Sequence, residues 1–74
     1  MAPNAEQWLA AFAAELGTDP PTKEQLDDIL GLAGVAARAS ERIAAPVSCS
    51  LAARAGMAPS VALATARRLA GDLT

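Results

Sequence analysis

The chain has 74 residues with a single cysteine and no histidine, which excludes an internal disulfide and a zinc site built from the usual cysteine and histidine ligands. Its net charge of −2 argues against affinity of the whole molecule for nucleic acid. No apolar run approaches the roughly 20 residues of a membrane span, and the polar N-terminus is unlike a signal peptide. We therefore expect one cytoplasmic domain over residues 1–74, with no metal and no cofactor.

The charge is unevenly distributed along the chain. Residues 1–37 contain six acidic residues and one lysine, whereas residues 38–74 contain five arginines and two acidic residues. The first half is therefore acidic, and a basic face can form only in the second half. A chain this small buries only about 60 % of its unfolded surface, so we expect close helix packing or association with another surface to stabilise it.

The sequence predicts a first helix over about residues 4–17. Asn4 is a good N-cap, and Gly17 with the Thr-Asp-Pro-Pro segment after it ends the helix. The apolar positions recur at helical spacing and form one stripe: Trp8, Leu9, Phe12, Ala13 and Leu16. We expect the residues of this stripe to pack into the hydrophobic core.

A second helix is predicted over about residues 22–45, opened by a capping box of Thr22 and Gln25. Because so much of its circumference is apolar, we expect it to be the central helix. Gly31 is assigned to its polar side, and Gly31 and Gly34 would each weaken an isolated helix by roughly 1 kcal/mol. Close approach of a neighbouring helix, or a kink, would explain both glycines.

Two shorter helices complete the prediction, over about residues 46–56 and 59–72. Pro46 ends the second helix and suits the first turn of the third, whose C-terminal stop is Gly56. Four helices joined by short connections, with no alternating segment of strand length, predict a compact all-α bundle.

Cys49 is the one candidate reactive residue. A third helix beginning at Pro46 would place its thiol in the first turn, where a helix N-terminus favours the thiolate. A catalytic thiolate also needs a base, normally histidine, and the chain has none. We favour the interpretation that residues 48–50 supply small side chains at a helix crossing, and we expect no enzymatic activity.

Residues 51–69 have the outline of a helix-turn-helix, in which the second helix would enter the major groove of DNA. That second helix reads SVALATA before its arginines, so it offers almost no side chain that can hydrogen-bond to base edges. A plain pair of antiparallel helices explains the same residues. A small DNA-binding regulator is therefore the alternative hypothesis.

Three segments follow one another along the chain: Trp8-Leu9 with AAELG after it, then ERIAAP, then ARAG. Over about residues 6–71 this arrangement resembles a small uncharacterised actinobacterial domain. That domain occurs alone or fused to molybdenum-cofactor guanylyltransferases, and near formate dehydrogenase accessory genes. The resemblance implies a molybdenum-cofactor or molybdoenzyme setting but no mechanism. Members often carry a histidine before the ERIAAP motif and a proline after its arginine, whereas this chain has no histidine and has Ile43 there, so no ligand role carries over.

We predict a non-catalytic accessory module that engages a protein partner or forms a homo-oligomer, and we do not expect nucleic acid or a membrane as its partner. Arg42 is expected in the last turn of the second helix, where its charge suits the negative helix end. Arg38 and Arg42, held by the corner at Pro46, would present a basic face to an acidic patch on the partner. The rim around Trp8 is the other candidate surface.

Overall fold

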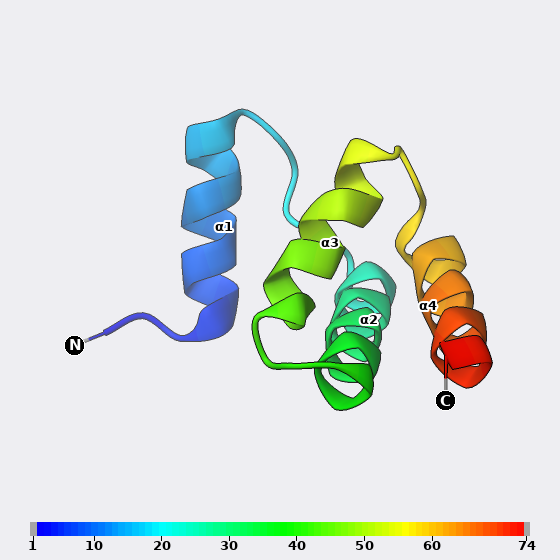
Figure 1. Cartoon of the computed structure of the whole chain (residues 1–74). Helices are drawn as coiled ribbons and strands as arrows, with labels where there is room; N and C mark the ends of the chain where they lie inside the picture. The colour runs from blue at the N-terminus through cyan, green and yellow to red at the C-terminus, as the bar shows by residue number, and fades with distance from the viewer. Residues whose placement is uncertain (1, 74) are drawn as a thin grey trace.

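The computed structural model describes residues 2–73, which contain four α-helices and no strand. In chain order α1 spans Ala5–Leu16, α2 spans Lys23–Ala39, α3 spans Ala44–Arg54 and α4 spans Pro59–Leu73 (Figure 1). The predicted all-α bundle of four helices is confirmed. No helix within residues 2–73 combines the length and the apolarity needed to cross a membrane.

Local hydrogen bonds fix the starts of α1 and α2, at the predicted N-cap Asn4 and the predicted capping box of Thr22 and Gln25. The Thr22 hydroxyl accepts a hydrogen bond from the Gln25 amide at 3.1 Å, and the Gln25 side chain accepts one from the Thr22 amide at 2.9 Å. Asn4 and Gln7 form the same reciprocal capping box at the start of α1. Each box satisfies two backbone groups that a helix start leaves without an intrahelical partner.

α2 is the central helix, as expected, because α3 and α4 both pack against it. A Cβ atom added at Gly31 would lie 3.2 Å from Leu63 Cδ2 of α4. Gly31 is therefore half-buried at the contact between α2 and α4, and its assignment to a polar side of the helix is wrong. The absent side chain lets the two helices approach closely, which is one of the two explanations offered for this glycine.

The junction between α2 and α3 differs from the prediction. The predicted helix over 22–45 starts as expected, but its C-terminal end is wrong, because α2 ends at Ala39 and α3 begins at Ala44. Pro46 lies inside the first turn of α3, where its missing N–H removes no helical hydrogen bond. Arg42 consequently lies in the connecting turn and not in the last turn of a helix. Proline cannot donate a hydrogen bond to the Arg42 carbonyl, so one unbroken helix through this segment would lose that bond.

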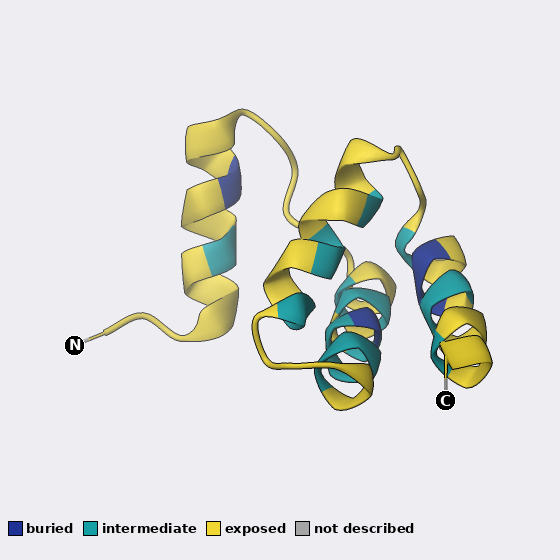
Figure 2. Cartoon of the chain, viewed as in Figure 1, coloured by how far each residue is buried: buried dark blue, intermediate teal, exposed yellow. Residues whose placement is uncertain are grey.

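The core is small. The buried hydrophobic residues within the described range are Ala13, Leu32, Ala62 and Leu63. Figure 2 shows the buried and half-buried residues on the sides of the helices that face one another. The accessible surface is 5721 Å², whereas a folded monomer of 7.5 kDa is expected to expose about 4,250 Å². The chain therefore exposes more surface than a compact monomer of its mass, and many of its large hydrophobic side chains are among the exposed ones.

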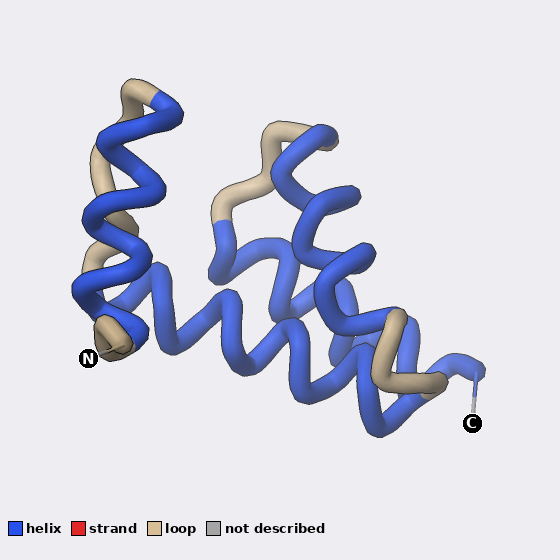
Figure 3. The backbone as a smooth tube through the Cα atoms, turned by 90° about the vertical axis from the view of Figure 1, so that its left-hand side faces the viewer, coloured by secondary structure: helices blue, strands red, loops and turns tan. Residues whose placement is uncertain are grey.

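α1 stands apart from α3, as Figures 1 and 3 show from two directions. Ala13 of α1 is buried and Leu9 is half-buried, so this side of the helix contacts the rest of the chain. Trp8, Phe12 and Leu16 of the same predicted stripe are exposed. The expectation that the whole stripe enters the core is wrong, because α1 contacts only a narrow part of the remaining structure.

Candidate functional site

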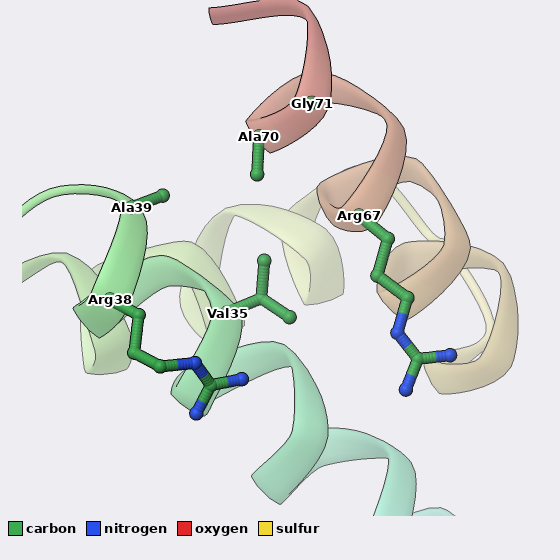
Figure 4. A pocket seen from close by; sticks show the side chains of 6 residues that line it. All are labelled: Val35, Arg38, Ala39, Arg67, Ala70 and Gly71. Carbon is green, nitrogen blue, oxygen red and sulfur yellow. The ribbon is translucent and has the colours of Figure 1, made fainter. Parts of the chain in front are cut away.

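The C-terminal halves of α2 and α4 border a shallow hollow of about 420 Å³ that two arginines flank. Arg38 comes from α2 and Arg67 from α4, and their side chains lie on opposite sides of Val35 in Figure 4. The remaining lining residues are small: Ala39, Ala70 and Gly71. We call this site the arginine hollow. It combines two cationic side chains with an apolar floor.

Neither Arg38 nor Arg67 forms an ion pair within residues 2–73. Two ion pairs occur in this range, each between exposed side chains four positions apart in one helix: Lys23–Asp27 and Arg68–Asp72. A guanidinium group is planar and can hold a carboxylate through two parallel hydrogen bonds. The arginine hollow therefore suits a ligand that carries a carboxylate next to an apolar group.

Two glycines shape the arginine hollow. A Cβ atom at Gly34 would lie 3.1 Å from Arg38 Nη1, so the Arg38 side chain folds back along α2 over the space that this glycine leaves. A Cβ atom at Gly71 would meet nothing within 4 Å. Because Gly71 lines the hollow and its first side-chain carbon would have room, a larger side chain there would narrow the hollow.

The structure separates the other candidate residues from the arginine hollow. Arg42 is exposed in the turn before α3, and Pro46 is exposed in the first turn of α3; neither lines the hollow. Trp8 lies on α1 and stacks on Phe12, with ring centroids 5.7 Å apart and ring planes 12° apart. Arg67 is one of the arginines that follow SVALATA in the candidate DNA-binding helix, and no local pattern in the sequence predicts that it lies near Arg38.

Cys49 does not lie at a helix N-terminus. α3 begins at Ala44, two residues before Pro46, so the prediction that Cys49 falls in the first turn is wrong. The thiol is half-buried, and its Sγ donates to the Ile29 carbonyl oxygen of α2 at 3.9 Å. It lines a small apolar cavity of about 110 Å³ between α2, α3 and α4. This placement agrees with a small side chain at a helix crossing.

The predicted helix-turn-helix corresponds to the end of α3, the turn and α4. Two polar side chains of α4 already have partners within the helix. The Thr65 hydroxyl donates to the Val61 carbonyl at 2.9 Å, and Arg68 pairs with Asp72 at 3.1 Å. Among residues 2–73 no group of three His, Cys, Asp or Glu side chains is placed to hold a metal ion.

Fold and site define a small all-α module with a two-arginine hollow on one side and an exposed apolar helix on another. The chain belongs to the DUF6457 family, whose model, described as a domain of unknown function (DUF6457), matches residues 2–74. This match confirms the resemblance to a small domain of unknown function. No curated protein and no solved structure matches the chain.

Proposed function

We propose that the chain is a non-catalytic helical accessory module that binds an acidic surface of a partner protein through the arginine hollow. One observation carries the proposal: Arg38 and Arg67 flank a single hollow and neither has an ion-pair partner within residues 2–73. A partner carboxylate would pair with either guanidinium group, and an apolar group beside it would cover Val35. The apolar contact would remove water from one side of the ion pair and strengthen it.

The class of partner comes from the sequence resemblance. That resemblance implies a setting in molybdenum-cofactor maturation or in a molybdoenzyme such as formate dehydrogenase. In such a setting the module would hold or position a protein and perform no chemistry itself. The arginine hollow adds a requirement, which is that the partner offers a carboxylate next to an apolar side chain.

The test begins with affinity capture from cells that make the chain, followed by binding measurements between the purified chain and the captured protein. Arg38→Ala and Arg67→Ala should each weaken binding by about tenfold, because each removes a cation that pairs with a partner carboxylate. Arg68→Ala is the control, since Arg68 is the exposed neighbour of Arg67 on α4, does not line the hollow and already pairs with Asp72. Rising salt should weaken the wild-type complex.

Two further variants define the site. Gly71→Leu keeps both arginines but adds a bulky side chain at a residue that lines the hollow, where a Cβ atom has room, so it should also weaken binding while leaving the fold intact. Arg42→Ala distinguishes the arginine hollow from the wider Arg38–Arg42 face predicted from the sequence, and we expect a smaller loss than for Arg67→Ala. Wild-type affinity in both Arg38→Ala and Arg67→Ala would contradict the proposal and direct attention to the surface around Trp8.

A further inference from the structure

Two rows of exposed apolar side chains lie on α1 and α3. Within each row the residues are four positions apart and therefore share one side of the helix. Every member is at least 47 % exposed, and we call the two rows together the apolar face: Trp8, Phe12 and Leu16 on α1, with Ile43, Val47 and Leu51 on α3 and its N-cap. Isolated exposed apolar residues are ordinary, whereas continuous rows mark an interaction surface.

The row on α3 points away from the core, and α1 stands on the side of α3 that is farther from α4 (Figure 1). Cys49 and Ala52 of α3 line the cavity shared with α2 and α4, so Val47 points away from that core. In Figure 1 α1 stands on the side of α3 opposite to α4. Between α1 and the start of α2 lies an apolar hollow of about 510 Å³, whose lining includes Leu9 and the exposed Leu30. An apolar hollow therefore lies beside α1, one of the two helices that carry the exposed rows.

The accessible surface of the chain leaves enough area for a dimer interface. The chain exposes 5721 Å², which exceeds the expectation for a folded monomer of its mass by about 1,500 Å². An obligate homodimer buries roughly 2,000 Å² or more in total, which is about 1,000 Å² from each chain. The excess surface on one chain is therefore sufficient for its half of a stable dimer interface.

The charges indicate a second copy of the chain as the occupant. Glu15 comes two helical turns after Trp8 and shares its side of α1, which carries no basic residue. Arg54 comes two turns after Val47 and shares its side of α3, which carries no acidic residue. In a twofold-symmetric interface each contact occurs twice, so α1 of one copy against α3 of the other would oppose acidic to basic residues at both contacts. Pairing α1 with α1 alone would oppose like charges.

We propose that two copies of the chain form a twofold-symmetric dimer in which α1 of each copy packs against α3 of the other and buries the apolar face. This inference goes beyond the proposed function and does not depend on it. The arginine hollow is lined by α2 and α4 and shares no residue with the apolar face. The dimer would therefore present two arginine hollows, and a partner with two acidic surfaces would bind with a gain from bivalency.

Sedimentation equilibrium of the full chain over a wide concentration range tests the dimer. We expect a reversible transition from the 7.5 kDa monomer to twice that mass. Val47→Glu should raise the dimer dissociation constant on the order of a hundredfold, because a carboxylate would enter the apolar interface without a partner. Val61→Glu is the matched control, since Val61 on α4 is 51 % exposed against 55 % for Val47 and lies outside the apolar face. It should dimerise like the wild type.

A second measurement follows the interface directly. Trp8 is the only tryptophan and belongs to the apolar face, so its fluorescence should shift to shorter wavelength as the dimer forms. Circular dichroism should show equal helix content in both glutamate variants, since both valines are exposed in the single chain. A monomer at every concentration would overturn the proposal. So would a wild-type dissociation constant in Val47→Glu, or equal loss of the dimer in both variants.

Discussion

Gly31 and Gly34 lie one turn apart on α2, and different neighbours account for them. At Gly31 a Cβ atom would press on the buried side chain of Leu63, whereas at Gly34 it would meet the end of the flexible and exposed Arg38 side chain. The first contact is part of the packing between α2 and α4. At Gly34 the missing side chain leaves room for Arg38 to lie along the helix beside the arginine hollow.

The same substitution at these two positions should therefore have different effects. Gly34→Ala should raise the free energy of unfolding by about 0.5–1 kcal/mol, because alanine favours the helix and Arg38 can move aside. Gly31→Ala should give no such gain, because Leu63 is held in the core and must shift to admit the methyl group. Urea denaturation of the two variants measures the difference. Equal stabilisation by both would contradict the assigned role of Gly31.

Cys49 provides a prediction about reactivity. Cys49→Ser should lower the free energy of unfolding by about 1 kcal/mol, because a hydroxyl replaces a soft apolar thiol beside an apolar cavity. Binding of the partner should be unaffected. Alkylation of the native thiol should be slow compared with the unfolded chain. Rapid native alkylation, together with loss of function at unchanged stability, would instead support a reactive thiol.

At the scale of the elements, local signals in the sequence identified most helix ends. The N-cap Asn4 and the capping box of Thr22 and Gln25 mark the starts of α1 and α2. Glycines with left-handed backbone follow α1 and α3, with φ of 74° at Gly17 and 72° at Gly56. The corner before α3 was missed because proline suits any position in the first helical turn. Pro46 therefore marked the vicinity of the corner but not the residue at which α2 ends.

The two capping boxes allow a test of how each helix contributes to stability. Thr22→Ala should lower the free energy of unfolding by about 1 kcal/mol, because α2 is central to the bundle. Asn4→Ala breaks the same kind of box, but in the dilute monomer it should cost less than about 0.5 kcal/mol, since α1 is only loosely attached. Denaturation followed by circular dichroism at low protein concentration gives both values. Equal costs would show that α1 belongs to the cooperative core.

At the scale of the whole molecule, the sequence predicted the all-α bundle but not the arrangement of its helices. Helical periodicity identified the apolar stripe of α1, yet it carries no information on which residues find a partner within the same chain. Arg38 and Arg67 likewise come together only through the packing of α2 on α4. Both features depend on contacts between residues that are distant in sequence. No local pattern in the sequence predicts such contacts.

The net charge of the whole molecule predicts that the chain does not bind DNA sequence-specifically. At physiological salt the chain should show no sequence-specific binding, because its net charge is −2 and α4 presents few side chains that reach base edges. Selection from a genomic library, followed by binding measurements with Arg67→Ala and Arg68→Ala, tests this expectation. A defined DNA motif whose binding is lost in those variants would favour the regulator hypothesis.

The central structural claim is that α1 is incompletely held by its own chain and is completed by a second copy. Amide hydrogen exchange resolved by residue tests this most directly, because it measures local opening of each helix. We predict that α1 amides exchange much faster than α2 amides in the dilute chain and become protected as the protein concentration rises. In Val47→Glu they should stay fast at every concentration. If α1 amides in the dilute wild-type chain are as protected as those of α2, or if concentration leaves them unchanged, the claim is contradicted.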